Sequence, residues 1–193
     1  MKLIYWNVWQ VPSIFTDKKG PERAKGVNDI LMNNFDVVIL NEAFTNKDIM
    51  LTHLDYKYML KTGKDTCRLG CLDSGLMILS KYPIVYSDYF IYNDKSNFDI
   101  FASKGCLVVK ISYKNKIYTI YNTHMQAGGR VKDNKVRMKQ TDELINYIQK
   151  ISKDEDFLLA GDYNMSEDLE SGHFENKRDA QERVETFNKL VDT

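Results

Sequence analysis

Two stretches of this chain decide its fold. The first begins at Leu3-Ile4-Tyr5-Trp6-Asn7 and ends at Asp36-Val37-Val38-Ile39-Leu40-Asn41-Glu42. The second begins at Ile117-Tyr118-Thr119-Ile120-Tyr121-Asn122-Thr123-His124 and ends at Asp156-Phe157-Leu158-Leu159-Ala160-Gly161-Asp162-Tyr163-Asn164. Each reads as strand, helix, strand, with polar side chains after the apolar runs. Because strand ends are where a rigid scaffold presents reactive groups, we expect these polar residues to meet at one rim. They are Asn7, Glu42, His124, Asp162 and Asn164.

Length and composition predict one ordered domain. The chain has 193 residues, of which 43% are hydrophobic, and this argues against disorder. Its 27 Lys and Arg balance its 27 Asp and Glu, so net charge provides no general attraction to nucleic acid or anionic lipid. The N-terminus lacks the apolar core of a secretory signal, and no apolar run approaches a membrane-spanning length. We therefore expect a cytoplasmic protein without a transmembrane segment.

The periodicity of apolar residues predicts a mixture of strands and helices. Strands are expected at residues 2–8, 36–41, 75–80, 84–92, 105–113, 116–123 and 157–161. Helices are expected at residues 22–34, 136–151 and 179–191, with a short helix at 46–54. Residues 10–21, 62–74 and 127–135 are expected to be loops. This pattern is typical of sheets packed together with helices outside them.

Three cysteines are too few for a disulfide framework. Cys67 and Cys71 lie four positions apart in an expected loop, so reduced thiols and a local disulfide are both open. A zinc site would need a second ligand pair nearby, which the sequence does not offer.

Glu42 is the best candidate for a metal ligand. It follows a continuous apolar run, and Mg²⁺ is typically held by one or two carboxylates together with substrate phosphate. Asn7 could offer its carbonyl oxygen to the same site or bind phosphate. The alternative is that both residues simply end strands and face water.

The second stretch supplies candidates for acid–base chemistry and phosphate binding. If the strand continues, Asp162 and Asn164 share one side, where Asp162 could orient or deprotonate a water and Asn164 could donate to a phosphate oxygen. An Asx turn is the alternative for this pair. His124 could act as an acid or base near neutral pH, or could be structural. His53 and His173 are interpreted as solvated.

Six sequence words, in order, carry a resemblance to a known family. They are Trp6-Asn7-Val8-Trp9, Leu40-Asn41-Glu42-Ala43-Phe44, Ser74-Gly75-Leu76-Met77-Ile78-Leu79-Ser80-Lys81-Tyr82-Pro83-Ile84, Ser103-Lys104-Gly105, Asn122-Thr123-His124-Met125-Gln126-Ala127 and Gly161-Asp162-Tyr163-Asn164-Met165. Their order resembles the endonuclease/exonuclease/phosphatase (deoxyribonuclease I-like) superfamily, and their wording resembles its neutral sphingomyelinases. The resemblance implies an α+β fold, a four-layer α/β/β/α sandwich.

The resemblance also implies a chemistry. It implies a phosphodiester hydrolase that uses Mg²⁺, or Mn²⁺, and converts sphingomyelin to ceramide and phosphocholine at a membrane surface. It assigns His124 to phosphate contact or to protonation of the leaving group. Asp99 and Lys104 match a pair found near the site in neutral sphingomyelinases, where Lys104 would neutralise phosphate charge. A surface ion pair is the alternative for these two residues.

Two other functions stay open. A nuclease of the same superfamily would lay a nucleic-acid backbone over the cationic run that follows His124, although a solvated face explains that run equally well. Its members are Arg130, Lys132, Lys135, Arg137 and Lys139. The other alternative is a catalytically impaired fragment, because the family's closing Ser-Asp-His word does not occur in this chain. On that basis we expect residues 1–193 to form a single domain that lacks the last strands at its C-terminal end.

Overall fold

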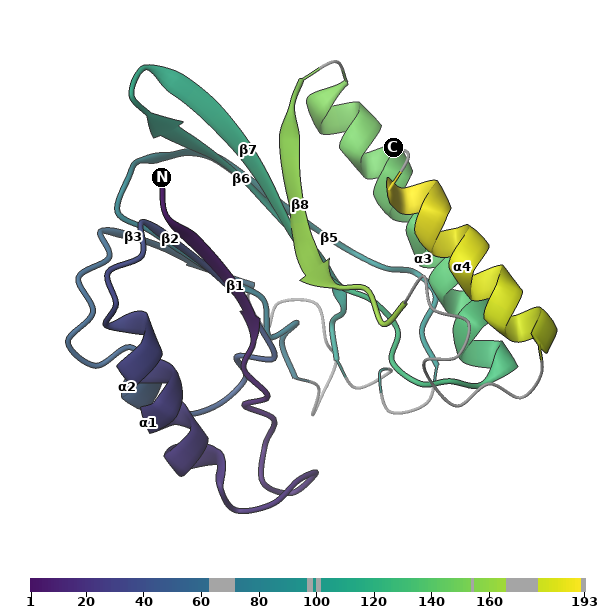
Figure 1. Ribbon diagram of the computed structural model, residues 1–193, viewed down its shortest axis with the longest axis horizontal. Coiled ribbons are helices and arrows are strands. Elements are labelled where there is room, and N and C mark those ends of the chain that lie inside the picture. The colour runs from purple at the N-terminus through teal and green to yellow at the C-terminus, as the bar shows by residue number, and fades with distance from the viewer. Residues whose placement is uncertain (63–71, 97–98, 100–101, 154, 166–176, 192–193) are drawn as a thin grey trace.

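The computed structural model describes residues 1–62, 72–96, 99, 102–153, 155–165 and 177–191. Within them, the strands form two four-stranded sheets, in the order β1-β2-β4-β3 and β5-β6-β7-β8. The sheets pack face to face, with helices on both outer sides (Figure 1). The predicted α+β fold, a four-layer sandwich, is confirmed.

Both predicted strand–helix–strand units are present, and each contains a parallel strand pair. In the first, β1 (Leu3–Asn7) and β2 (Val37–Asn41) are joined through α1 (Gly20–Leu31). In the second, β7 (Lys116–His124) and β8 (Phe157–Asp162) are joined through α3 (Val131–Ser152). The register pairs Asn7 with Asn41 and His124 with Asp162. The carboxyl ends of all four strands therefore lie at the same end of the sandwich (Figure 1).

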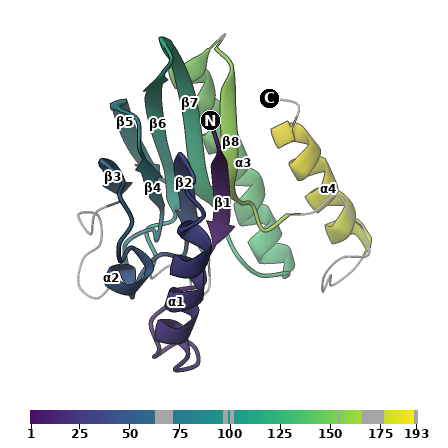
Figure 2. The same ribbon diagram turned by 60° about the vertical axis from the view of Figure 1, so that its left-hand side comes forward.

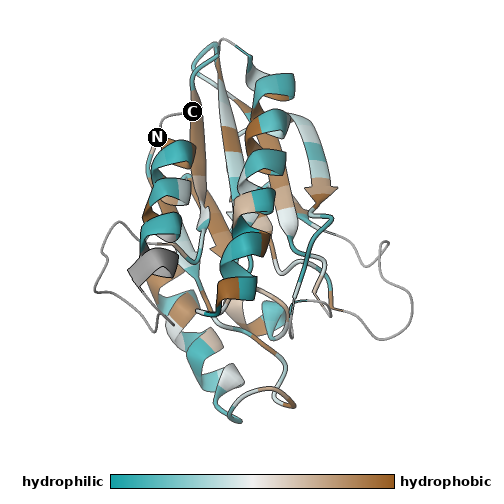
Figure 3. Ribbon diagram, turned by 90° about the vertical axis from the view of Figure 1, so that its right-hand side faces the viewer, coloured by the Kyte–Doolittle hydropathy of each residue, from teal (hydrophilic) through white to brown (hydrophobic). Residues whose placement is uncertain are grey.

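Antiparallel strands complete the sheets. The remaining elements are α2 (Lys47–Met50), β3 (Tyr58–Lys61), β4 (Met77–Ser80), β5 (Ile84–Ile91), β6 (Gly105–Tyr113) and α4 (Lys177–Val191). Helices α1 and α2 cover the outer face of the first sheet, and α3 and α4 cover that of the second (Figure 2). The outward sides of α3 and α4 are largely hydrophilic (Figure 3).

The layers explain why the central strands read as continuous apolar runs. Val38 and Leu40 of β2 face the core beneath α1, whereas Val37 and Ile39 face the core between the sheets. A strand buried on both faces needs apolar residues at every position, not at alternate ones. In β6, Val108 faces the core beneath α3, and its neighbours face the inter-sheet core in the same way.

Two asparagines join the sheets through the inter-sheet core. The Asn41 amide donates to the Thr123 carbonyl oxygen at 2.7 Å, and the Asn122 amide donates to the Leu40 carbonyl oxygen at 3.0 Å. Each unit thus donates one buried hydrogen bond to the other. The bonds lie one or two residues before the polar rim, so they fix the position of one unit's strand ends against the other's.

Several predicted boundaries were wrong. Helix α1 begins at Gly20, with a proline in its first turn, where the backbone N–H is not needed, so Gly20 and Pro21 are not loop. Helix α3 begins at Val131 in the expected loop, where the Asp133 side chain accepts from the Arg130 backbone N–H and satisfies a free donor at the helix start. The prediction missed β3, a strand of four residues. Cys67, Cys71 and His173 lie outside the described residues.

No described helix combines the length and the apolar character that crossing a membrane requires.

Candidate active site

The rim residues that the sequence singles out come together where the two units meet. Glu42 directly follows β2 with a left-handed backbone (φ 56°), a conformation that costs a non-glycine residue energy. Gly75 packs against it, and a Cβ there would stand 3.0 Å from the Glu42 Cα and 2.8 Å from the Phe44 ring. Gly75 itself has φ +67°. The glycine in the Ser-Gly-Leu word therefore makes room for the turn that presents Glu42.

Asn7 bridges the carboxylates of the two units. Its Nδ2 donates to Glu42 Oε1 and to Asp162 Oδ2, both at 2.9 Å. Its Oδ1 accepts from the Trp9 backbone N–H at 3.1 Å. The amide nitrogen, and not the predicted carbonyl oxygen, thus faces the carboxylates. Asn7 holds two like charges close together, an arrangement suited to a cation between or beside them.

His124 lies buried beneath these carboxylates. Its Nε2 is 3.9 Å from Glu42 Oε1 and 3.9 Å from Asp162 Oδ2, and 3.1 Å from Lys104 Nζ. Burial, reinforced by the Lys104 charge, holds the pKa of His124 well below its ordinary value. The imidazole is therefore neutral at pH 7.

Lys104 is a buried cation at the floor of the site, not one half of a surface pair. Its ammonium donates to Met125 O at 2.7 Å and lies 3.1 Å from both Asp99 Oδ2 and His124 Nε2. Burial lowers the pKa of Lys104, and the Asp99 carboxylate opposes that effect. Asp99 also accepts from the Ala127 backbone N–H at 2.7 Å. Asp99 therefore fixes Lys104 against the loop that follows His124.

Asn164 reaches the site by a different route from the one predicted. Strand β8 ends at Asp162, and Asn164 has a left-handed backbone (φ 52°), so the alternation argument for this pair was wrong. The Asn164 backbone N–H donates to Asp162 Oδ1 at 3.0 Å, which is an Asx turn. The turn directs the Asn164 side chain to Met125 O at 3.1 Å. Both residues still border the same site.

The donor set at the rim fits a hard divalent cation. Ligand atoms of Glu42, His124 and Asp162 all lie within 4.8 Å of one another. Burial raises the pKa of Glu42, Asn7 and Lys104 lower it, and the nearby Asp162 raises it further. Crowded carboxylates of this kind are stabilised by a cation with oxygen ligands. Glu42 is a better ligand than His124, because the His124 Nε2 faces the Lys104 ammonium.

A cavity of about 350 Å³ opens over this polar floor. Its polar lining includes Glu42, Asp99, Lys104, His124 and Asn164. The rest of the lining is mainly apolar: Trp9, Val11, Phe15, Phe44, Leu72, Ala102 and Ala127. These apolar walls were not predicted from the sequence. Trp9 and Phe44 stand inside the quoted words, and their large apolar side chains next to Asn7 and Glu42 were the available signal.

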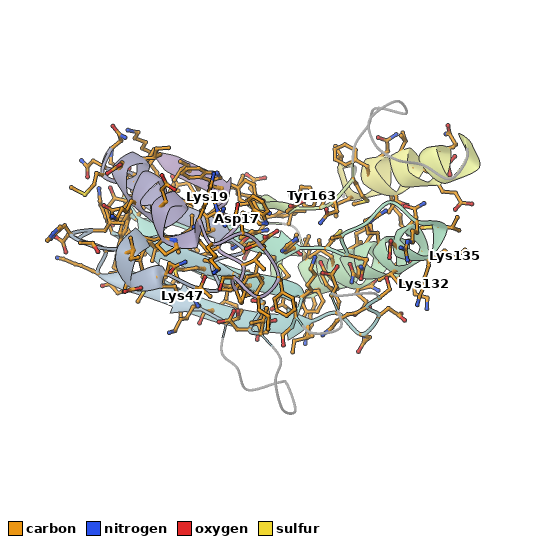
Figure 4. All side chains as sticks on the ribbon, turned by 90° about the horizontal axis from the view of Figure 1, so that it is seen from below. Asp17, Lys19, Lys47, Lys132, Lys135 and Tyr163 are labelled. Atoms are coloured by element: carbon orange, nitrogen blue, oxygen red, sulfur yellow. The ribbon has the colours of Figure 1, made fainter. Side chains whose placement is uncertain are left out.

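The cationic run after His124 does not form a continuous basic surface. Arg137 is buried and donates to the carbonyl oxygens of Gln126 and Gly128, at 2.9 and 2.7 Å. Lys139 lies 3.1 Å from the Asp94 carboxylate. Lys132 and Lys135 lie in the first two turns of α3, and Figure 4 shows both of them well to the side of Tyr163. His53 is exposed, as predicted.

Comparisons with known proteins agree with this architecture. The sequence profile of the Endonuclease/Exonuclease/phosphatase family matches residues 4–186. Phospholipase C of Staphylococcus aureus is 30% identical over 190 residues, covering 86% of this chain and 57% of that protein. Mouse Sphingomyelin phosphodiesterase 2 is 31% identical over 189 residues, covering 86% of this chain and 41% of that protein. The chain thus spans about half the length of these relatives.

A solved structure resembles the whole described fold. It is the crystal structure of a beta toxin mutant from Staphylococcus aureus with bound magnesium ions, with a TM-score of 0.75 and 25% identity. The match covers 97% of this chain and 70% of that one. Together with the family profile, it identifies the class: this chain belongs to the Endonuclease/Exonuclease/phosphatase family.

Proposed function

We propose that this chain is a metal-dependent phosphodiesterase whose substrate is sphingomyelin or a related choline phosphodiester. One observation carries the proposal: Asn7 joins the Glu42 and Asp162 carboxylates directly above a buried Lys104–His124 pair. Negative groups that could hold a cation and a positive group that could hold phosphate thus share one floor. Relatives named Phospholipase C and Sphingomyelin phosphodiesterase 2 support the reaction class.

Each rim residue has a task in this proposal. A divalent cation, Mg²⁺ or Mn²⁺, would polarise the phosphoryl oxygen and stabilise the leaving oxygen. Glu42 would hold it, while Asn7 keeps Glu42 and Asp162 in place. Asp162 would accept a proton from the attacking water. Lys104 would offset the charge of the phosphate, His124 would contact it, and Asn164 would donate to one of its oxygens.

The walls of the cavity favour an amphiphilic substrate. Trp9, Phe15 and Phe44 offer apolar and aromatic surface beside the charged floor. Such surface suits a lipid or a choline group, since aromatic rings attract quaternary ammonium ions. A nuclease would gain most from exposed cations beside the site. Here Arg137 is turned inward and Lys139 is paired. The run therefore offers Arg130, Lys132 and Lys135 as its exposed cations.

The test compares two substrates under the same conditions. Sphingomyelin in mixed micelles and supercoiled plasmid are each incubated with the chain and Mg²⁺. We expect phosphocholine release that disappears in Asp162→Asn and persists in the control Asp29→Asn, an exposed position on α1. Plasmid nicking that depends on Asp162, without phosphocholine release, would establish the nuclease alternative.

Failure of the chain to cleave either substrate would also be informative. If Mg²⁺ raises the unfolding temperature of the chain but neither substrate is cleaved, the site binds metal without turnover, as expected of a catalytically impaired fragment. That outcome would contradict the proposed phosphodiesterase activity of this chain and leave its metal site standing.

A further inference from the structure

The connection between β1 and α1 exposes large apolar side chains beside the cavity. Ile14 is 83% exposed, Phe15 54% and Trp9 50%. They come from one loop, and Ile14 is the most exposed large apolar residue among those that the structure describes. Exposing such side chains to water is unfavourable, and a cluster of them marks an interaction site.

The loop is held in shape from within, so its apolar tip does not fold back to cover itself. The buried Gln10 backbone N–H donates to Glu42 O at 2.9 Å, and its carbonyl accepts from the Thr45 N–H at 3.0 Å. At the tip, the Phe15 N–H donates to Pro12 O at 2.9 Å and closes a turn. These backbone bonds leave the Ile14 side chain pointing at solvent.

Positive charge flanks the apolar tip. Residues 17–25 contain four cationic and two acidic side chains, and Lys18 and Lys19 are exposed. Arg23 donates to Asp17 at 2.7 Å and stacks over the Trp9 ring at 4.5 Å. The Asp17 charge is therefore neutralised, and the position of the Trp9 ring is fixed by the Arg23 guanidinium. Figure 4 looks onto the rim and shows Asp17 and Lys19 on its α1 side. Apolar side chains bordered by lysines match a bilayer surface, where acyl chains lie beneath phosphate groups.

The same loop forms part of the substrate cavity. Trp9, Phe15 and Thr16 line it together with Glu42 and His124. A bilayer surface into which Ile14 and Phe15 inserted would therefore lie against the mouth of the cavity. A lipid headgroup held in that surface would have only a short path to the polar floor.

We propose that the β1–α1 loop docks this protein on a phospholipid bilayer, with Ile14, Phe15 and Trp9 entering the interface and Lys18 and Lys19 meeting lipid phosphates. The inference rests on the proposed function for the purpose of docking, which is access to a lipid phosphodiester. Binding itself is independent of turnover. A failed activity assay therefore leaves the docking proposal testable.

Vesicle binding is the direct test. Vesicles of equimolar phosphatidylcholine and phosphatidylglycerol are sedimented with the chain in EDTA, which prevents metal-dependent turnover. We expect wild type to co-sediment and Ile14→Ser to partition about tenfold less, as the loss of one inserted apolar side chain predicts. The matched control is Ile117→Ser, which removes another exposed isoleucine, 54% exposed, at the opposite end of β7 from His124. Equal binding by wild type and Ile14→Ser would overturn the proposal.

A spectroscopic readout shows whether the loop itself enters the bilayer. Trp6 and Trp9 are the only tryptophans, so Trp6→Phe leaves Trp9 as the single emitter. We expect phospholipids brominated on their acyl chains to quench its fluorescence, and unchanged emission would contradict insertion. The Ile14→Ser comparison stands without this variant if Trp6→Phe fails to fold.

The last arm separates docking from catalysis and from protein contacts. Ile14 does not line the cavity, so Ile14→Ser should slow hydrolysis of sphingomyelin in vesicles and leave hydrolysis of a water-soluble choline phosphodiester unchanged. If Ile14→Ser instead abolishes self-association in sedimentation velocity, with vesicle binding intact, the loop is a protein contact and the proposal is wrong.

Discussion

The two strand–helix–strand units share a topology, but they are held together differently. In the first, the residues that α1 buries are Gly20, Ala24, Val27 and Leu31, which carry no polar side chains. In the second, α3 buries Asp133, Asn134, Arg137, Gln140 and Thr141 along with its apolar residues. Helix α1 therefore packs through apolar side chains alone, whereas α3 packs through both apolar and polar side chains.

The polar contacts of the second unit fix the loop that follows His124. Gln140 Oε1 accepts from the Gln126 N–H at 2.8 Å, and Arg137 donates to the carbonyl oxygens of Gln126 and Gly128. The equivalent loop of the first unit, after Asn7, is held by backbone bonds and points apolar side chains outward. One loop therefore positions catalytic candidates, whereas the other offers a surface.

The largest expected effect comes from the residues that both units bring to the rim. Glu42→Gln should lower turnover about a thousandfold, roughly 4 kcal/mol of barrier, because it removes the charge that would hold the cation. Asp162→Asn should cost a similar factor. Steady-state phosphocholine release measures both, with Glu22→Gln on the exposed side of α1 as control. A Mg²⁺-dependent rise in unfolding temperature equal in wild type and Glu42→Gln would remove Glu42 from the metal site.

The next effect tests the difference between the helices. Arg137→Met should lower the free energy of unfolding by about 3 kcal/mol, because the buried carbonyl oxygen of Gln126 and the partly buried one of Gly128 both lose a charged donor. Arg23→Met, in the corresponding helix, should cost much less, since Arg23 pairs with the exposed Asp17. Urea denaturation measures both. Equal costs would show that the polar contacts of α3 contribute no more stability than a surface ion pair.

The sequence predicted the two units because their signals are local. Alternating or continuous apolar runs gave the strands, and the polar residues that follow them gave the rim. Contacts between segments that lie far apart along the chain could not be predicted from the sequence. The sequence left Lys104 open as a phosphate contact or as half of a surface pair, and only the packing of β6 against β7 shows it buried next to His124.

Local chemistry also misled the prediction at two places. Gly128, Gly129 and the cations after them favour a loop, yet Asp133 caps a helix that begins at Val131. In Gly161-Asp162-Tyr163-Asn164 both a continuing strand and an Asx turn satisfy the sequence. The backbone of Asn164 decides for the turn. The apolar tip at Ile14 was recognised as loop, but its exposure depends on the buried Gln10 and so requires the structure.

A smaller effect concerns the bonds that each unit donates to the other. Asn41→Leu and Asn122→Leu each replace a buried donor by an apolar group of similar shape, and each should cost about 1–2 kcal/mol. Reciprocal bonds of this kind predict similar costs in the two variants. Chemical denaturation measures them, with the exposed Asn146→Leu expected to change stability by less than about 0.5 kcal/mol. If only one of the two variants had a lower free energy of unfolding, only one of the two hydrogen bonds would stabilise the contact between the sheets.

The smallest effect lies at the start of the second strand in each unit. Asp36 precedes β2 and accepts from the Lys2 backbone N–H at 2.6 Å and from the Tyr82 hydroxyl at 3.2 Å. The Lys2 bond is the main reason that the pKa of Asp36 lies below its ordinary value, and burial opposes it. A carboxyl with a lowered folded-state pKa stabilises the fold above its unfolded value. That contribution is lost as pH falls through the folded value.

Asp36→Asn should therefore lower the free energy of unfolding by less than about 1 kcal/mol at pH 7, since the group lies near the surface. The difference from wild type should stay constant down to about pH 5 and shrink below about pH 4, where the wild-type carboxyl also becomes neutral. Urea titrations between these pH values measure it. Asp156, the exposed residue before β8, is the matched position in the other unit, and Asp156→Asn should leave stability unchanged. A difference for Asp36→Asn that grows as the pH falls would contradict the lowered pKa and leave the β1–β2 junction dependent on backbone bonds alone.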